Sequence, residues 1–429
     1  MRRTFASVLV LVLAGCGQLG GSAPLPHEEA TGGLRADAGP LAQQLYGSGT
    51  ISHIVVIVQE NRSVDNLFNG LPGADTAQSG RDSRGQTIRL KPVSLTAPYD
   101  ISHTHSAYET EYAGGQMDGF DRVKTKCQSV RRNCPPPRIR AYGYVPRADV
   151  QPYFDLAERY AFADEMFETN QGPSFPAHQY LVSGTSAIEN GSTLRASENP
   201  RSPANRQTGG CDAPRGTRGQ LISDTGREDT YAFPCFDRTA LPDLIDKRGL
   251  TWHYYQERSG PGLWNGLDAV QHIWKNRAEY KQDVITPSAQ VLKDIPNGRL
   301  ANVTWITPSA AASDHAGSTD GSGPSWVASI VSTIAFSSFW DSTAIIVVWD
   351  DWGGWYDHVA PQQYNSYELG MRVPLLVISP YSKQGYVSHV HYEFGSILKF
   401  IEQTFQLGSM HTTDDRANGL GDFFDFGSR

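Results

Sequence analysis

The chain has 429 residues, which is enough for one large α/β domain or two ordinary domains. Hydrophobic residues make up 39% of it and charged residues 19%, a composition that excludes a disordered chain and provides ample material for a core. The formal net charge of −8 gives no reason to expect a nucleic acid partner.

The beginning of the chain is typical of an export signal. Two arginines precede the apolar stretch 6–14, which is too short to span a bilayer. The sequence Leu-Ala-Gly-Cys that ends at Cys16 resembles the bacterial lipobox. We expect a lipoprotein signal peptide over 1–15, a lipid anchor on Cys16, and a flexible Gly-, Ala- and Pro-rich tether over 16–47. We expect the mature protein to be exported and anchored to a membrane, where it faces the periplasm or lies on the outer membrane or cell surface. The alternative is ordinary secretion with an unmodified cysteine.

The other cysteines are Cys127, Cys134, Cys211 and Cys235. An even number in an exported chain indicates disulfides, and the spacing matches no zinc pattern. Local pairs, Cys127 with Cys134 and Cys211 with Cys235, would each close a loop. Three pairings are possible, and the sequence alone does not choose among them.

The first predicted strand is Ile54–Val58, an apolar and β-branched run typical of a strand buried on both faces. It is followed by Glu60-Asn61-Arg62-Ser63-Val64-Asp65-Asn66-Leu67-Phe68. Further on, Asp100 precedes two histidines, His103 and His105, and then the segment Met117–Phe120. A loop histidine is usually only solvated, but two of them here favour a role in a site.

The segment Thr169–Gly184 contains Gly172-Pro173 as a turn and resumes an apolar periodicity after Pro176, which predicts a helix. Ser174 then lies at or near the helix N-cap. One interpretation is that its hydroxyl only caps the helix. The other is that the helix N-terminus and a metal favour its alkoxide.

Residues 186–229 lack a periodic apolar pattern and indicate a long insertion loop, which makes them a candidate lid. After them, Asn302–Thr307 is predicted to be a strand, and the loop that follows carries Asp314-His315. The run Ala344–Val348 predicts another buried strand. Arg372–Pro380 is expected to be the last buried strand.

Asp350 and Asp351 come just after the apolar run Ala344–Val348, and Gly353-Gly354 and Asp357-His358 follow them. In open α/β sheets, ligands bind beyond the carboxyl ends of strands. Two carboxylates placed there carry a large desolvation cost unless a cation lies between them, so we expect a divalent metal. The alternative is that both acids only cap a turn. Asp357 and His358 are metal ligands, supporting residues or structural residues.

Several of these segments, in order, resemble the bacterial phosphoesterase family of non-specific phospholipases C and acid phosphatases. They are Glu60–Phe68, Asp100–His103 with Met117–Phe120, Gly172–Pro176, Trp305–Pro308 with Asp314-His315, and the strand that ends in Asp350-Asp351. The resemblance extends from Ile51 to Gln406. It implies an α/β fold like that of alkaline phosphatase, with a mostly parallel central sheet, helices on both faces and long loop insertions.

The resemblance also implies roles for residues. Ser174 falls on the family's nucleophile, and His103 on its motif histidine; His105 is extra. In relatives a histidine precedes the final helix, but this chain has Phe394 there. Either His389 or His391 takes its role, or the role is absent.

The candidate site residues named below are expected to converge on one edge of the sheet. The predicted metal ligands are Glu60, Asn61, Ser174, Asp350 and Asp351, an all-oxygen set that suits a hard divalent cation. Asn61, His103 and His315 would stabilise phosphate oxygens, and a histidine would protonate the leaving group.

The expected function is metal-dependent hydrolysis of phosphoric esters through a phosphoserine at Ser174, carried out by a single catalytic domain over 48–429. The substrate is a phospholipid, as for a phospholipase C-like phosphodiesterase, or a phosphomonoester, as for an acid phosphatase. A non-catalytic membrane-anchored binding lipoprotein that kept the fold is the alternative. Loss of Ser174 or of a motif acid would favour that alternative, and none is lost.

Overall fold

A computed structural model describes residues 50–128 and 134–427. The expected signal peptide over 1–15, lipidation at Cys16 and tether over 16–47 lie outside these residues and stay predictions, as does the domain boundary at residue 48. Within the described ranges, no helix combines the length and the apolar character needed to cross a membrane.

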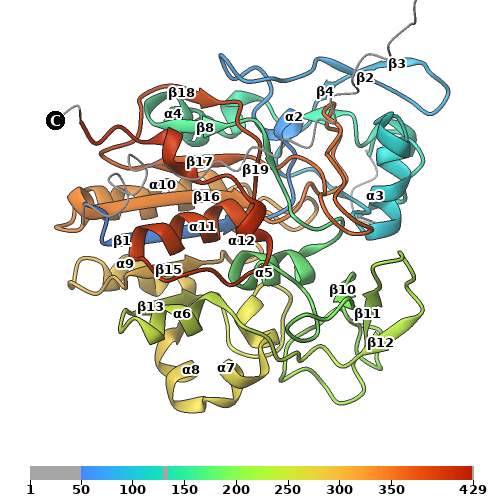
Figure 1. The fold of residues 1–429 in the computed structure, drawn as a ribbon. Helices are drawn as coiled ribbons and strands as arrows, with labels where there is room; N and C mark the ends of the chain where they lie inside the picture. The colour runs from blue at the N-terminus through green and yellow to red at the C-terminus, as the bar shows by residue number, and fades with distance from the viewer. Residues whose placement is uncertain (1–49, 129–133, 428–429) are drawn as a thin grey trace, which may run out of the picture. The chain divides into compact units, whose positions relative to one another are not determined.

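An eight-stranded sheet forms the centre of the fold (Figure 1). Its spatial order is β14 (Val284–Ile285), β13 (Trp252–Tyr255), β15 (Val303–Ile306), β1 (His53–Gln59), β16 (Thr343–Trp349), β17 (Leu375–Ile378), β8 (Ala161–Ala163) and β18 (Tyr386–Ser388). Every strand runs in one direction except β17, which is antiparallel to both neighbours. The expected mostly parallel α/β sheet is therefore confirmed.

Strands β1 and β16 form the buried middle of the sheet. Ile54–Val58 is at most 1% exposed, and Ala344–Val348 is fully buried, as their unbroken apolar sequences predict. The two strands pair in parallel from His53 with Thr343 to Gln59 with Trp349. Since both strands end at the same level, Glu60 and Asp350 leave the sheet side by side.

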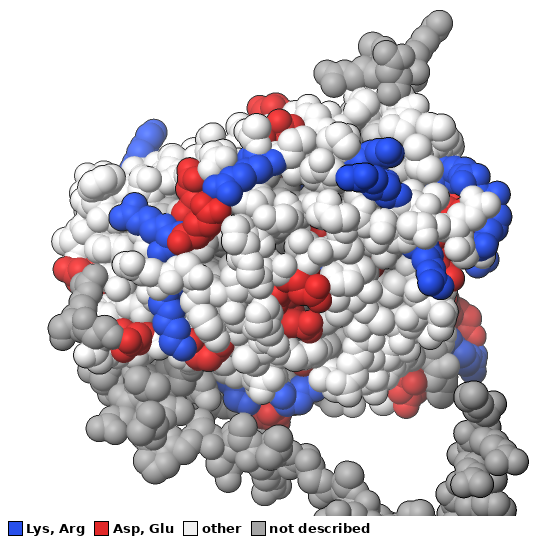
Figure 2. All heavy atoms as spheres, turned by 90° about the horizontal axis from the view of Figure 1, so that it is seen from above, with Lys and Arg blue, Asp and Glu red and all other residues white. Residues whose placement is uncertain are grey.

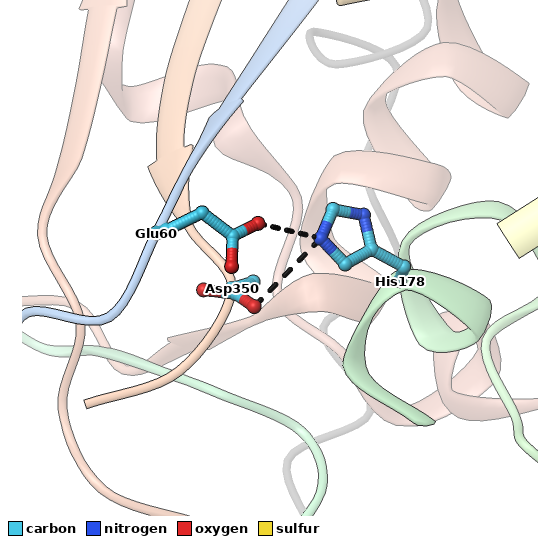
Figure 3. A group of neighbouring side chains, drawn as sticks. All are labelled: Glu60, His178 and Asp350. Carbon is cyan, nitrogen blue, oxygen red and sulfur yellow. Dashed lines mark hydrogen bonds and ion pairs between the residues drawn. The ribbon is translucent and has the colours of Figure 1, made fainter. Parts of the chain in front are cut away.

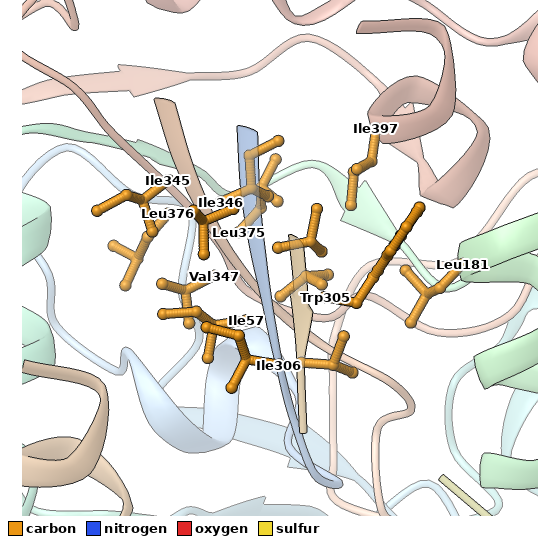
Figure 4. Close-up of a cluster of buried hydrophobic side chains, with 14 of the residues drawn as sticks. Ile57, Leu181, Trp305, Ile306, Ile345, Ile346, Val347, Leu375, Leu376 and Ile397 are labelled. Atoms are coloured by element: carbon orange, nitrogen blue, oxygen red, sulfur yellow. The ribbon is translucent and has the colours of Figure 1, made fainter. Parts of the chain in front are cut away.

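Helices cover both faces of this sheet (Figure 1). On one face, α5 (Ser174–Ser183) packs with α11 (Phe394–Phe405), and on the other, α4 (Gln151–Arg159) packs with α10 (Gly323–Ala335). In Figure 4, Leu181 of α5 and Ile397 of α11 lie beside Trp305 of β15. The shorter helices are α2 (Val64–Leu67), α3 (His105–Tyr112), α6 (Leu241–Lys247), α7 (Gln271–Lys275), α8 (Arg277–Asp283), α9 (Val291–Asp294) and α12 (Thr413–Arg416).

The segment 186–229 is mostly irregular, as expected of an insertion loop, but it also contains two short strands. It supplies β10 (Arg195–Ala196) and β11 (Gly219–Ile222) of a three-stranded antiparallel sheet that β12 (Thr230–Ala232) completes. These strands are too short to show an alternating pattern. The disulfide between Cys211 and Cys235 links the segment to the chain that follows it, and the other local pair, Cys127 with Cys134, also forms.

Short two-stranded sheets lie outside the central one. They pair β2 (Ser79–Arg81) with β3 (Thr87–Arg89), β4 (Lys91–Pro92) with β7 (Gly143–Tyr144), β5 (Tyr99–Ile101) with β6 (Thr125–Cys127), and β9 (Met166–Phe167) with β19 (Tyr392–Glu393). On the face shown in Figure 2, the described Lys and Arg side chains are interspersed with Asp and Glu on a largely uncharged surface.

Candidate functional site

The structure brings Glu60, Asn61, Ser174, Asp350 and Asp351 together at the carboxyl edge of the sheet, and we call these residues the acidic centre. Each is at most 2% exposed. The Ser174 hydroxyl lies 3.3 Å from both Glu60 Oε2 and Asp351 Oδ2. The Asn61 side chain donates to Asp351 Oδ1 at 2.5 Å, and its backbone N–H donates to Asp350 Oδ1 at 3.1 Å.

The backbone around Asn61 explains the Gly-Gly pair after the two aspartates. Asn61 has a left-handed φ of 58°, and Gly353 one of 68°. A Cβ at Gly353 would lie 2.4 Å from the Asn61 carbonyl oxygen, so only glycine permits this approach. The Gly353 N–H donates to Asp351 Oδ1 at 2.8 Å, which helps to orient that carboxylate.

Ser174 is the first residue of α5, and its side chain makes no capping hydrogen bond; the N-cap residue is Pro173. The hydroxyl instead points at Glu60 and Asp351. The amide groups of the first turn place positive potential near this oxygen, which favours an alkoxide there. The geometry of Ser174 therefore differs from that of a serine that only caps a helix.

The acidic centre is electrostatically strained without a cation. Burial and the negative charges of Asp350 and Asp351 raise the pKa of Glu60 well above its usual range. Burial and the charge of Asp351 raise the pKa of Asp350 to about 8. Asn61 Oδ1 and Asp350 Oδ2 are buried and accept no hydrogen bond from the described residues. Free oxygen donors beside three carboxylates fit a divalent cation.

His178 also lies at this site, although it is not among the residues that the sequence motifs predict. Its Nε2 lies 3.0 Å from Glu60 Oε1 and 3.7 Å from Asp350 Oδ2 (Figure 3). Burial lowers the pKa of His178 to about 3, so the contact with Glu60 is a hydrogen bond from a neutral ring rather than an ion pair. The spacing in the sequence could have indicated His178. Residues i and i+4 share a helix face, and His178 is four residues after Ser174.

His103 and His315 lie next to each other, with ring centroids 5.7 Å apart. His103 follows β5 and is held by a 2.8 Å contact between Nδ1 and the Ile101 carbonyl. Burial lowers the pKa of His103, but attraction to Asp351 and Asp100 outweighs burial and raises it to about 9. A cationic ring beside the acidic centre suits a phosphate oxygen.

His315 is positioned by the residue before it. The buried carboxylate of Asp314 accepts hydrogen bonds from Tyr153 at 2.8 Å and from Trp349 at 3.0 Å. The Asp314 carbonyl accepts another from Arg62 at 2.8 Å. These bonds anchor the loop that presents the His315 ring to His103.

Asp357 and His358 lie in a separate cluster with Asp65 and Arg372. Arg372 donates to Asp357 at 2.7 Å, and His358 Nδ1 contacts Asp65 at 2.8 Å. The geometry of Asp65, Asp357 and His358 would allow a metal, but the buried guanidinium of Arg372 already neutralises the carboxylates. Asp357 and His358 therefore contact Asp65 and Arg372 rather than the acidic centre.

His358 is expected to make the protein more stable below pH 6.5 than above pH 8. Burial lowers its pKa, but the hydrogen bond and charge of Asp65 and the charge of Asp357 outweigh burial and raise it to about 8. Because the folded pKa exceeds the unfolded one, the stabilisation is complete below 6.5 and is lost as the pH rises through 8. It amounts to about 2 kcal/mol at most. Asp65, Asp75, Asp357 and Arg372 are the charged groups that face the ring.

Urea unfolding of wild type and His358→Gln across this pH window measures the effect. The difference in unfolding free energy between the two proteins should shrink as the pH rises. A constant difference would contradict the prediction.

His105 lies outside the acidic centre. Its Nδ1 is 3.1 Å from Glu228 and its Nε2 is 3.4 Å from Gln171. Burial lowers the pKa of His105, but the hydrogen bond and charge of Glu228 raise it overall. His105 thus connects the start of α3 to the 186–229 segment.

The position of the family's further histidine holds Phe394, a fully buried first residue of α11. His389 pairs with Asp164 at 2.9 Å, and His391 stacks on Phe167 with centroids 4.7 Å apart. Both rings are therefore engaged with partners of their own.

The fold and the site together define an α/β enzyme with a serine and an acidic centre at the carboxyl edge of its sheet. The chain belongs to the phosphoesterase family, whose family model matches residues 51–408. This confirms the resemblance found in the sequence motifs and identifies a phosphoester hydrolase.

Several curated proteins are similar over most of the chain. Phospholipase C B of Mycobacterium tuberculosis is 24% identical, over 91% of this chain and 81% of its own length. Non-hemolytic phospholipase C of Pseudomonas aeruginosa is 24% identical, over 83% of this chain and 54% of its own. Non-specific phospholipase C6 of Arabidopsis thaliana is 24% identical, over 85% of this chain and 69% of its own length.

Solved structures with low sequence identity are also similar. A protein in the alkaline phosphatase superfamily from Vibrio parahaemolyticus is 9% identical with a TM-score of 0.37, covering 83% of this chain and 67% of its own. Murine ectonucleotide pyrophosphatase/phosphodiesterase 5 is 10% identical with a TM-score of 0.41, and the match covers 65% of this chain and 96% of the murine chain.

Proposed function

We propose that this protein hydrolyses phosphoric esters through a phosphoserine at Ser174, with a divalent cation in the acidic centre. The observation that carries the proposal is the Ser174 hydroxyl at the start of α5, 3.3 Å from two carboxylates and free of any capping bond. Glu60, Asn61, Ser174, Asp350 and Asp351 would hold the cation. When bound, it would lower the pKa of the hydroxyl and neutralise phosphate charge.

The residues of the chain then divide the chemistry. Ser174 Oγ attacks phosphorus, and its proton passes to a carboxylate oxygen of Glu60 or Asp351, both within reach. His103 and His315 donate hydrogen bonds to the phosphate oxygens as their negative charge rises. One of these histidines protonates the leaving oxygen. A water molecule then attacks the phosphoserine and restores the Ser174 hydroxyl. The product is phosphate from a monoester substrate, or a phosphomonoester from a diester substrate.

The substrate that we propose is a phosphodiester of the phospholipid type. The support comes from curated relatives named phospholipase C, which match this chain at 24% identity. Side-by-side assays with nitrophenyl phosphocholine, phosphatidylcholine and nitrophenyl phosphate test it. We expect the two diesters to be hydrolysed with the higher kcat/KM. Preference for the nitrophenyl monoester would make the protein an acid phosphatase instead.

We also propose that the protein is exported and anchored to a membrane by lipid on Cys16. The support is the Leu-Ala-Gly-Cys sequence after an apolar stretch. Cell fractionation should find the wild type with membranes, and mass spectrometry should find a lipid on Cys16. Cys16→Ser should release the protein or block its processing. Wild-type protein found wholly in the soluble fraction would contradict the anchor.

A further inference from the structure

His178 lies against the acidic centre from the side of helix α5. Its side chain is 1% exposed, and its Nε2 lies between Glu60 Oε1 at 3.0 Å and Asp350 Oδ2 at 3.7 Å (Figure 3). A histidine so placed has two possible roles. It binds the cation through Nε2, or it donates Nε2–H to the carboxylates that bind the cation.

The other ring nitrogen distinguishes these roles. His178 Nδ1 is buried and has no hydrogen-bond partner among the described residues. A proton on Nδ1 would therefore be a buried, unsatisfied donor, which is unfavourable. The proton belongs on Nε2, where Glu60 Oε1 accepts it. A protonated nitrogen has no lone pair for a metal, and histidine ligands nearly always donate their second N–H to a partner, which Nδ1 lacks.

We propose that His178 is a positioning residue that holds Glu60 for metal binding and is not itself a metal ligand. The hydrogen bond at Glu60 Oε1 fixes the rotation of the carboxylate, so that Oε2 faces the Ser174 hydroxyl at 3.3 Å. The inference rests on the proposed function, because it assigns a role within the same metal site.

The same N–H also lies near the second carboxylate. Asp350 Oδ1 accepts a hydrogen bond from the Asn61 backbone, whereas Asp350 Oδ2 accepts none from the described part of the chain and faces His178 Nε2. Without the imidazole, Glu60 Oε1 would lose the donor that holds it, and Asp350 Oδ2 would lose the N–H that it faces. The Glu60 carboxylate would then be free to rotate out of the position that binds the cation, which weakens the site.

The test is direct binding of Mn²⁺ by isothermal titration calorimetry, with folding checked by circular dichroism. His178→Ala should weaken binding by about 10- to 100-fold. His178→Gln keeps a neutral N–H donor and should recover most of that loss. His253→Gln is the matched control, because His253 on β13 also has a buried Nδ1 without a described partner. It should leave Mn²⁺ affinity unchanged. At saturating Mn²⁺, His178→Ala should regain most of its kcat.

Pulsed electron paramagnetic resonance of the Mn²⁺-loaded wild type supplies the second readout. No coupling to a histidine nitrogen is expected, and a clear ¹⁴N coupling that disappears in His178→Gln would overturn the proposal. Equal Mn²⁺ affinity of wild type and His178→Ala would overturn it as well, while leaving the proposed function intact. A wild type that binds no Mn²⁺ at the acidic centre would overturn both.

Discussion

Ser174→Ala is expected to remove nearly all turnover while the protein stays folded and still binds substrate. The loss in kcat should be on the order of 10⁴-fold or more, because no neighbouring group replaces a lost nucleophile. Loss of an N-cap costs about 1 kcal/mol of stability. Since the Ser174 hydroxyl makes no capping bond, its removal should cost less than that. Steady-state kinetics and thermal unfolding of the same variant separate the two effects.

Two further serine variants sharpen this result. Ser174→Thr keeps a hydroxyl and should retain measurable activity. Ser183→Ala is the matched control, because Ser183 ends the same helix, is buried and has no described hydrogen-bond partner. It should leave kcat unchanged. Acid quench during turnover should trap phosphorylated Ser174 in the wild type, detected by mass spectrometry. Wild-type turnover in Ser174→Ala would end the proposed mechanism.

The position of the acidic centre could be predicted because its signals are local. Glu60 and Asp350 each follow closely on an apolar, β-branched run, and such runs form neighbouring parallel strands when buried on both faces. Parallel strands place their carboxyl ends at the same edge of a sheet. Gly172-Pro173 likewise marks the start of α5 and thus the place of Ser174.

The features that were missed depend on distant partners or lack a local pattern. Every residue of α5 is buried, so no polar face distinguishes His178 from the core. The role of Asp357 depends on Arg372, which comes from a different segment and approaches only in the fold. The direction of β17 has no signature in its apolar sequence, because a buried strand has the same pattern in either direction.

Removal of the metal is expected to abolish turnover without unfolding the protein, and a divalent cation should restore it. The main hydrophobic core contains β1 and β16 but none of the residues of the acidic centre, so the fold does not depend on the metal. Exhaustive chelation followed by metal analysis and activity assays measures this. Full activity in demonstrably metal-free protein would contradict the site described above.

Metal binding should also depend steeply on pH, because protons compete with the cation for the same carboxylates. Burial and Asp351 raise the pKa of Asp350 to about 8, and burial with both aspartates raises that of Glu60. Below pH 8 the metal-free centre therefore holds protons that the cation must displace, so affinity should fall as the pH falls. Calorimetry in buffers of different ionisation enthalpy should detect proton release on binding. Asp350→Asn should weaken binding and release fewer protons. Above pH 8, where Asp350 is charged, it should also stabilise the metal-free protein, because it removes one buried charge from the repelling group.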